Sequence, residues 1–584
     1  MALFLLDHGA GNVQSLANSI RKLGYEFSWI SSPADFDKAS VCHIIYPLTC
    51  SYHGWYRHKV LIFPGQGAFH TAINCLTERG LLKPLYDYIQ SGKPYFGICI
   101  GMQVLFASSA ESPSTCGLGV IPCQIERFDD TTKPVPHMGW NNAEPIDPDS
   151  SSSEGVSSSN HYYFVHSYCA RYDPEGSPEA ARWAHSTTQY GQEVFMSTVR
   201  NGNVFGAQFH PEKSSIAGLA VIDTWIKQSL AGRAQAEPSR RTPRLPKPQD
   251  GFTKRIVACM DVRANDEGDL VVTKGDQYDV REKCSPSTSS LSSTTTVKAA
   301  GAVRNLGKPV ALAARYFDSG ADELCLLNIT SFRHSPLQDQ PMLAVVRAAA
   351  ECVFVPLTIG GGIKDTVDPD GTKRTAVEVA GAYFRVGADK VSIGSEAVYA
   401  VEKLRAADGI PDGSSAIESI SKVYGTQAVV VSIDPKRVYV DPATYDGPYK
   451  DELVHGRPDG LENERGKAWW YQCTVSGGRE TRPVSVVQLA QGSQALGAGE
   501  IILNSIDRDG TGLGFDHGLI GLVKRAVTIP VVASSGAGTK EHFERVFVET
   551  DVEAALAAGI FHRGEVGIQE IKSAARQAGI SVRS

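Results

Sequence analysis

Gly97-Ile98-Cys99-Ile100-Gly101-Met102-Gln103 is the stretch from which the fold of the first half of this 584-residue chain can be predicted. It follows the apolar pair Tyr95-Phe96 and leads into Val104-Leu105-Phe106. Gly-x-Cys-x-Gly is the layout of a nucleophile elbow, a tight strand-to-helix turn that exposes one side chain. The glycines tolerate a strained backbone, and a helix that starts beside the sulfur favours the thiolate. The alternative is a buried structural cysteine at a glycine-rich turn.

A second stretch, Gln208-Phe209-His210-Pro211-Glu212-Lys213-Ser214, favours the nucleophile. A cysteine nucleophile needs a base, and the base needs a carboxylate that fixes its tautomer. His210 and Glu212 are two residues apart, so on an extended segment they project from the same side. Together the two stretches resemble the class I, triad-type glutamine amidotransferases. This resemblance implies Cys99 as the nucleophile, His210 as its base and Glu212 as the orienting acid.

The resemblance includes the residues that would bind glutamine. Pro64-Gly65-Gln66-Gly67 matches the loop that completes the oxyanion hole with the backbone N–H of Ile100. The family usually has a small apolar residue where Gln66 stands. Because the oxyanion donor is a backbone N–H, we expect this change to matter little. The implied oxyanion and glutamine-binding set is Gly65, Gln66, Gly67, Ile100 and Gln103.

Length and composition limit the classes of protein that remain. A chain of 584 residues is long enough for two to four domains. Its formal net charge of −7 provides no basic field for nucleic acid. The apolar start ends at Asp7, too early for a signal peptide, and no apolar run is long enough to span a membrane. Twelve scattered cysteines form no disulfide framework, so we expect a reducing, cytoplasmic setting. As a separate expectation, the chain acts as a monomer.

The chain divides into two domains and a linker. Residues 1–230 alternate strand-like and helical patterns and predict an α/β glutaminase domain. Residues 231–250 combine proline and charge without apolar periodicity, which is typical of a linker; a targeting signal is the alternative for its basic run. Residues 251–584 predict a (β/α)8 barrel. Its eight strands should begin near Ile256, Glu323, Val353, Lys390, Ala428, Ile501, Val531 and Ala554.

The barrel sequence contains an internal repeat. Residues 320–328 echo residues 497–504, and Ala258-Cys259-Met260-Asp261-Val262 echoes Val431-Ser432-Ile433-Asp434-Pro435. We therefore expect two half-barrels. Asp261 and Asp434 then end strands one and five and face each other across the barrel mouth, where opposed carboxylates suit general acid and general base roles. Alternatively, either aspartate caps a helix or binds Lys274 or Arg437.

Repeated halves should also repeat their ligand sites. Barrel enzymes bind phosphate at the strand C-termini, where glycine loops present backbone N–H groups. Ile359-Gly360-Gly361-Gly362-Ile363 with Gly394-Ser395 predicts one such site. Ser534-Ser535-Gly536-Ala537-Gly538 with Gly559 predicts the other. The two pairs indicate a substrate with a phosphate at each end.

The barrel resembles the cyclase of the imidazole glycerol phosphate synthases. The matching pieces are Arg255-Ile256-Val257-Ala258-Cys259-Met260-Asp261-Val262, Val272-Thr273-Lys274-Gly275, Asp389-Lys390-Val391-Ser392-Ile393 and Ser505-Ile506-Asp507-Arg508-Asp509-Gly510-Thr511. A glutaminase ahead of the barrel is the order of the fused eukaryotic forms. The resemblance implies that ammonia from L-glutamine passes through the barrel. There it would convert a bis-phosphorylated formimino-carboxamide ribonucleotide (PRFAR) to imidazole glycerol phosphate and aminoimidazole carboxamide ribonucleotide (AICAR) in histidine biosynthesis.

The same resemblance assigns further roles and implies neither a metal nor an organic cofactor. Lys274 resembles a mobile-loop residue that closes over substrate, and Asp507 a residue that lines the second phosphate half. Lys213 and Asp389 resemble a pair through which the two domains dock. Their roles are implied by the family and not by spacing.

Four charged residues stand near predicted strand starts, and the family resemblance implies a role for them in ammonia transfer. Arg255, Glu323, Lys390 and Glu500 comprise two residues of each sign. Charges at one end of a barrel need mutual pairing, and the resemblance makes them a salt-bridged gate. The alternative is that some of them face helices or solvent.

Two other functions share part of this pattern. A vitamin B6 synthase also couples such a glutaminase to a barrel, but it needs a Schiff-base lysine where this chain has Asp261 and Asp434. A degenerate paralogue that acts as a metabolite sensor or scaffold would not need the intact residues Cys99, His210 and Glu212. Purified protein supplied with glutamine, ammonia or PRFAR separates these functions.

Residues 41–59 form an insertion, because the family passes almost directly from Phe36-Asp37-Lys38-Ala39 to Leu61-Ile62-Phe63. A zinc site of Cys42, Cys50, His53 and His58 is one interpretation, but the spacing matches no paired-ligand pattern. Val41-Cys42 can be encoded by GTATGT, Leu48-Thr49 by a CTNAC branch sequence and Lys59 by a codon ending in AG. We interpret the segment as a retained short intron.

We predict that mature transcripts lack the codons for residues 41–59. Their removal joins Ser40 to Val60 in frame and restores the expected strand. Transcript sequencing across the junction measures this directly, and mature messages that uniformly contain these codons would show the interpretation to be wrong.

Overall fold

A computed structural model describes residues 2–40, 59–147, 155–231, 241–264, 270–273, 306–329, 337, 341–458 and 460–584. Its contacts divide the chain into two compact units. The first comprises residues 1–253, 381–389 and 420–428, and the second comprises the rest. The predicted boundaries at 230 and 250 stay a prediction. Lys274 and nearly all of the insertion, residues 41–58, lie outside the described residues.

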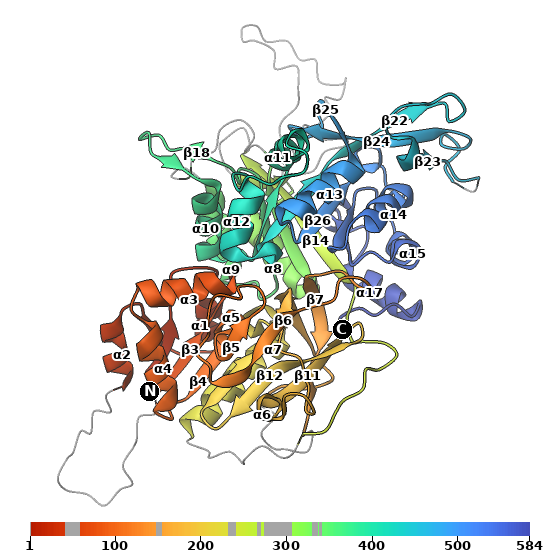
Figure 1. Cartoon of the computed structure of the whole chain (residues 1–584). Helices are drawn as coiled ribbons and strands as arrows, with labels where there is room; N and C mark the ends of the chain where they lie inside the picture. The colour runs from red at the N-terminus through yellow and green to blue at the C-terminus, as the bar shows by residue number, and fades with distance from the viewer. Residues whose placement is uncertain are drawn as a thin grey trace, which may run out of the picture. The chain divides into compact units, whose positions relative to one another are not determined.

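The described part of the first unit is built around an eight-stranded mixed sheet with the order β2-β1-β3-β4-β13-β12-β11-β8 (Figure 1). The strands from β2 to β13 are parallel, and β12, β11 and β8 continue the sheet antiparallel. Their bounds are β1 Ala2–Leu6, β2 Phe27–Ile30, β3 Lys59–Phe63, β4 Tyr95–Ile98, β8 Glu144–Pro145, β11 Ala184–Tyr190, β12 Glu193–Asn201 and β13 Val204–Ala207.

Helices cover both faces of this sheet. Successive side chains of a strand point to opposite faces, so Leu3 and Leu5 join one apolar cluster while Phe4 and Leu6 join another. The first cluster contains α1 (Gln14–Lys22) and α7 (Ser215–Leu230). The second contains α2 (Pro33–Ser40), α3 (Phe69–Glu78) and α4 (Leu82–Gln90). The result is a three-layer α/β unit, as predicted.

Smaller elements complete the first unit. A three-stranded sheet contains β5, β6 and β10, and a separate pair contains β7 and β9. The bounds are β5 Phe106–Ser109, β6 Ile121–Arg127, β7 His137–Asn142, β9 His161–His166, β10 Tyr168–Cys169, α5 Ile100–Gln103, α6 Pro178–Ala181 and η1 Pro211–Lys213.

Eight parallel strands close into a barrel within the described part of the second unit, which confirms the predicted (β/α)8 fold. Neighbours pair in chain order, and β28 pairs with β14 to close the ring. The strands are β14 Arg255–Ala264, β16 Glu323–Asn328, β17 Leu357–Gly360, β20 Lys390–Ile393, β21 Val429–Ile433, β26 Glu500–Asn504, β27 Val531–Ser534 and β28 Ala554–Ala557. A short strand, β15 (Leu270–Thr273), pairs antiparallel with β14.

Helices alternate with these strands, and Figure 1 shows several of them beside the barrel strands β14 and β26. No helix in the described part of the chain is both long and apolar enough to cross a membrane. The bounds are α8 Pro309–Asp318, α9 Pro341–Ala350, α10 Ala376–Val386, α11 Ser395–Ala406, α12 Ala416–Tyr424, η2 Thr426–Ala428, α13 Val486–Leu496, η4 Ile506–Arg508, α14 His517–Ala526, α15 Lys540–Thr550, α16 Gly559–His562 and α17 Ile568–Gln577.

The third barrel strand begins later than the sequence predicts. The prediction near Val353 is wrong by four residues, because β17 begins at Leu357. The apolar residues 353–355 are buried in the connection after α9 instead. Pro356 separates them from the strand, and proline has no N–H group to donate into a parallel ladder.

A four-stranded antiparallel sheet between β21 and α13 was not predicted. It contains β22 (Pro435–Val440), β23 (Val454–His455), β24 (Ala468–Val475) and β25 (Glu480–Ser485); η3 (Lys450–Glu452) precedes β23. Two further short strands, β18 (Thr366–Val367) and β19 (Lys373–Arg374), form a hairpin after β17.

The buried side chain of Arg437, on β22, connects this small sheet to the barrel through ion pairs. Its guanidinium lies 2.6 Å from Glu464 and 2.6 Å from Asp516, the N-cap of α14, and 4.2 Å above the ring of Trp469. Arg437 was one alternative partner for Asp434. Its paired carboxylates are instead those of Glu464 and Asp516.

Two histidines are buried next to each other on the paired strands β7 and β9. His137 Nδ1 lies 3.2 Å from His166 Nε2, and the rings of Phe164 and Tyr190 stack on His137. Burial lowers the pKa of His166 to about 3 and the pKa of His137 well below its usual value. Both rings are therefore neutral in the folded protein at neutral pH.

We predict that the free energy of unfolding falls as the pH drops below about 6.5, the usual pKa of an unfolded histidine. Between that pH and the low folded-state pKa values, the unfolded chain binds more protons than the folded chain, so acid favours unfolding. Each buried histidine contributes a slope of about 1.4 kcal/mol per pH unit. Urea unfolding of the full chain at several pH values measures the slope. It should be shallower by that amount in His137→Phe, and an unchanged slope would contradict the explanation.

Candidate active sites

Cys99 occupies a strained turn between β4 and α5. Its backbone has φ 49° and ψ −104°, a conformation that a residue with a side chain rarely adopts. A Cβ atom on Gly97 would lie 2.2 Å from the carbonyl oxygen of Gly101, and one on Gly101 would lie 2.2 Å from that of Phe63. Only glycine therefore fits on either side of Cys99, which explains the Gly-x-Cys-x-Gly pattern sterically.

Parallel pairing of β4 with β13 brings Cys99 and His210 to the same edge of the sheet. Ile98 pairs with Ala207, and the Cys99 N–H donates to the Ala207 carbonyl oxygen at 2.7 Å. His210 follows the end of β13 by three residues. Side chains beyond the carboxyl ends of parallel strands are well placed to share a ligand site.

His210 and Glu212 lie where the predicted triad with Cys99 needs its base and its carboxylate, and their catalytic roles stay a prediction. His210 Nδ1 lies 2.7 Å from Glu212 Oε1, and all three side chains are buried. Burial opposes protonation of His210, but the charges of Glu212 and of the Cys99 thiolate raise its pKa well above the usual value. Because Nδ1 faces the carboxylate, the charged ring holds one proton there and the other on Nε2, and Nε2 is the nitrogen left to exchange a proton with the thiol.

Two glutamine side chains join this site, and one of them was not predicted. Gln208 Nε2 lies 3.5 Å from Cys99 Sγ and is placed to donate to the sulfur. The predicted residue Gln103 donates to Gln208 Oε1 at 3.1 Å and to the Tyr168 carbonyl oxygen at 3.2 Å. Gln208 stands two residues before His210, so its nearness to the triad was the available sequence signal.

The predicted oxyanion loop packs directly on Ile100. A Cβ atom on Gly65 would lie 1.6 Å from Ile100 Cγ2, and Gly67 has φ 151°. Gln66 is buried, and its Nε2 donates to the backbone oxygen of Asp389. A small apolar residue cannot make this hydrogen bond, so the substitution at Gln66 has a structural effect that the sequence does not reveal.

Lys213 and Asp389, the predicted docking pair, form a buried ion pair. Their charged atoms lie 2.7 Å apart, and Asn12 Nδ2 also donates to Asp389 at 2.8 Å. All three residues belong to the first unit as defined above. Their role in docking stays a prediction.

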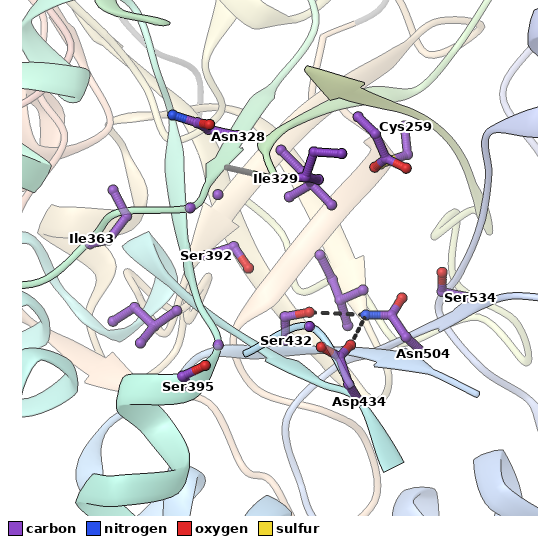
Figure 2. Close-up of a pocket in the computed structure, with 18 of the residues that line it drawn as sticks. Cys259, Asn328, Ile329, Ile363, Ser392, Ser395, Ser432, Asp434, Asn504 and Ser534 are labelled. Atoms are coloured by element: carbon purple, nitrogen blue, oxygen red, sulfur yellow. Dashed lines mark hydrogen bonds between the residues drawn. The ribbon is translucent and has the colours of Figure 1, made fainter. Parts of the chain in front are cut away.

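The barrel contains a cavity of about 310 Å3 at the carboxyl ends of its strands (Figure 2). Its walls come from all eight barrel strands and the loops that follow them, and a cavity of this size suits a small molecule. Five predicted residues line it: Asp261, Asp434, Gly361, Gly362 and Ser395. Ser535, from the predicted 534–538 loop, lines it too, and Asn328, Ser432, Arg479, Asn504 and Asp509 line it without having been predicted as site residues.

Three predicted residues are not among the described residues that line the cavity: Asp507, Gly536 and Gly559. Asp507 Oδ2 accepts the backbone N–H of Arg437 at 2.9 Å, and burial raises the pKa of Asp507. Gly536 has φ 92°, and a Cβ atom there would lie 2.2 Å from the Gly514 carbonyl oxygen. A backbone requirement thus explains this glycine without a ligand.

The four predicted gate residues are the first residues of β14, β16, β20 and β26. Arg255 and Lys390 each bind both Glu323 and Glu500 at 2.5 to 2.7 Å, which forms a closed ring of ion pairs. All four side chains are buried. Burial opposes ionisation of Glu323, but Lys390 and Arg255 hold its pKa below the usual value. The alternative in which these residues face helices or solvent is excluded for the described structure.

Comparisons with known proteins agree with this architecture. Residues 4–224 match the family model of class-I glutamine amidotransferases, and residues 255–567 match that of a histidine biosynthesis protein. The chain is 49% identical to an imidazole glycerol phosphate synthase of Emericella nidulans over 99% of this chain and 98% of the relative. It is 48% identical to that of Schizosaccharomyces pombe over 98% of each. The HisF subunit of the synthase of Haloarcula marismortui is 36% identical over 57% of this chain and 99% of the relative. The chain therefore belongs to the family of imidazole glycerol phosphate synthases in which a glutamine amidotransferase and a histidine-biosynthesis barrel are fused.

Proposed function

We propose that this enzyme hydrolyses L-glutamine at Cys99 and uses the ammonia to convert PRFAR into imidazole glycerol phosphate and AICAR. The observation that carries the proposal is the presence, in one chain, of a buried cysteine triad and of a barrel cavity that contains two aspartates. Neither the triad nor the cavity chemistry requires a metal or an organic cofactor.

In the first unit, the residues of the elbow perform amide hydrolysis. His210 takes the Cys99 proton, and the thiolate attacks the side-chain amide carbon of glutamine. The resulting oxyanion accepts hydrogen bonds from backbone N–H groups of the 65–67 loop and of Ile100. His210 then gives its proton to the departing ammonia, and water releases glutamate from the sulfur.

In the second unit, Asp261 and Asp434 exchange protons with PRFAR as ammonia adds and the imidazole ring closes. The loops of Gly361, Gly362 and Ser395 hold one phosphate, with Lys274 closing over the substrate. The 534–538 loop, Gly559 and Asp507 serve the other phosphate. Asp509 and Ser535 are better placed than Asp507 to face the ligand, because they line the cavity.

We further propose that ammonia travels along the barrel axis through the ring of four charges. The interior beyond the ring is apolar, with Val257, Cys325, Val430 and Ile502 in one cluster. Such a lining admits neutral ammonia and disfavours ammonium, because burying an unpaired charge is costly. Opening the ring requires Lys390 or Arg255 to leave its partners.

We also propose that the chain acts as a cytoplasmic monomer whose two domains dock through Lys213 and Asp389. Both sets of catalytic residues come from one chain, and none of the described cysteines forms a disulfide, as a reducing compartment favours. A relative from Arabidopsis thaliana, 47% identical over 99% of this chain, is named as chloroplastic.

We predict that Cys99→Ala abolishes glutamine-dependent cyclisation and leaves ammonia-dependent cyclisation intact, because the thiolate serves amide hydrolysis alone. Asp261→Asn and Asp434→Asn should each abolish cyclisation with either nitrogen source, because a proton-transfer group is lost at little change in volume. Loss of PRFAR, followed with glutamine and then with ammonium, measures both. Loss of both activities in folded Cys99→Ala, or normal rates in both aspartate variants, would contradict the proposal.

We predict that Lys390→Met uncouples the two reactions, so that more glutamate forms for each PRFAR consumed, while ammonia-dependent cyclisation and glutamine hydrolysis persist. The reason is that the ring can no longer close around Glu323 and Glu500. Lys572→Met is the matched control, because Lys572 is equally buried and pairs with Asp322 at 2.6 Å outside this ring. Unchanged stoichiometry in Lys390→Met, or equal uncoupling in Lys572→Met, would end the gate proposal.

A further inference from the structure

Asp261 and Asp434 occupy equivalent positions in the two half-barrels but have different neighbours. In the first half, Asp261 pairs with Leu327 of the adjacent strand. In the second half, Ile433 pairs with Leu503, so the next pair along these strands is Asp434 with Asn504. Leu327 and Asn504 are therefore equivalent, and both line the cavity. Asp261 therefore has an apolar side chain as its neighbour on the adjacent strand, and Asp434 has a side-chain amide.

A second pair of equivalent positions also differs in how strongly its side chains form hydrogen bonds. Cys259 stands two residues before Asp261, and Ser432 stands two residues before Asp434. Cys259 Sγ lies 4.0 Å from Asp261 Oδ1, and a thiol is a weak donor. Ser432 instead presents a hydroxyl oxygen that accepts a hydrogen bond from Asn504 at 3.0 Å.

Asn504 is held in a single orientation by its two acceptors. Its Nδ2 donates to Asp434 Oδ1 at 2.8 Å and to Ser432 Oγ at 3.0 Å (Figure 2). An amide nitrogen carries two hydrogens, so these bonds use both of them. A carboxylate oxygen only accepts, which places the nitrogen of Asn504, and not its oxygen, against Asp434.

Asp434 is also fixed at its backbone. Its carbonyl oxygen accepts hydrogen bonds from the Thr474 N–H at 3.2 Å and from Thr474 Oγ1 at 2.6 Å. Thr474 lies on β24 of the small sheet that follows β21. The side-chain carboxyl group of Asp434 is therefore held by a barrel residue, and its main chain is held by the small sheet.

The electrostatic consequence is a difference between the two aspartates. A hydrogen bond from an N–H group stabilises the ionised form of a carboxyl group, whereas an apolar neighbour does not. Surroundings that differ between two carboxyl groups in one cavity push their pKa values apart and so assign one as acid and the other as base. The Asn504 amide provides that difference in the second half, because Leu327, at the equivalent position of the first half, has no polar side-chain atom, and the Cys259 thiol is the weaker kind of donor.

We propose that Asn504 is a positioning residue for the cyclase reaction, which holds Asp434 ionised and correctly oriented and so breaks the equivalence of the two half-barrels. The proposal rests on the proposed function, because it assigns a role within that reaction. Asn504 acts through Asp434, and its substitution should alter the rate of the chemical step more than the binding of PRFAR.

The test uses the full chain and ammonia-dependent cyclisation of PRFAR at a fixed concentration of free ammonia. Asn504→Leu copies the residue of the first half. It should lower kcat by about 10- to 100-fold, the scale of a misplaced catalytic group, with a much smaller change in KM. Glutamine hydrolysis, which belongs to the other unit, reports that the protein is folded.

Asn504→Asp separates a positioning role from a merely structural one. Two adjacent carboxylates raise the pKa of one of them, so the new side chain protonates as the pH falls and can again donate to Asp434. The ratio of variant to wild-type kcat should therefore rise as the pH falls from about 8 to about 6. The same ratio for Asn504→Leu should stay flat.

The double variant Asn504→Leu with Leu327→Asn is the matched control, because it moves the amide to the other half and keeps the cavity composition. It should remain as slow as Asn504→Leu. Recovery in this variant, or a wild-type kcat in Asn504→Leu, would overturn the proposal. A wild-type enzyme that does not consume PRFAR would instead overturn the proposed function itself.

Discussion

Parallel pairing of neighbouring strands is the constraint on which both candidate sites depend. Strands that run in the same direction end at the same edge of a sheet, so the side chains that follow their ends lie close together. In the first unit, β4 and β13 bring Cys99 to His210. In the second, closure of β14 onto β28 turns that edge into a ring and places Asp261 and Asp434 on one cavity. Strand pairing places Cys99 at this edge, and the glycines around it allow the tight turn that it adopts there.

Barrel closure also explains why four charges can be buried at strand starts. Each charge comes from a different strand, so the ion pairs form only when the strands have the correct register. Breaking one partner leaves an uncompensated buried charge, which is strongly destabilising. Arg255 is the first residue of β14, and Asp261 lies near the end of the same strand. At the usual rise per residue of a strand, the two residues are about 20 Å apart. The charged ring and the aspartates thus lie at opposite ends of an apolar interior.

The sequence predicts well what depends on local pattern. The eight barrel strands, the elbow and the His210–Glu212 pair follow from short apolar runs, glycine spacing and strand geometry. The sequence does not predict the features that depend on tertiary contacts. The partner of Gln66 is a backbone oxygen more than 300 positions away, and the burial of Arg437 depends on Glu464 and Asp516. Asp507 and Asp509 are the same residue type, so the sequence does not distinguish them; in the structure Asp507 lies within η4, Asp509 follows it, and of the two Asp509 lines the cavity.

An internal repeat explains the architecture of the barrel but cannot by itself explain its chemistry. Two identical halves would give Asp261 and Asp434 identical surroundings, so that only the bound substrate could assign them different roles. Positions at which the halves differ can make that assignment before the substrate binds. Those positions should lie next to the aspartates, because a hydrogen bond acts over a few ångströms. The pairs Leu327–Asn504 and Cys259–Ser432 meet both conditions, so departures from the repeat identify functional residues that the repeat itself conceals.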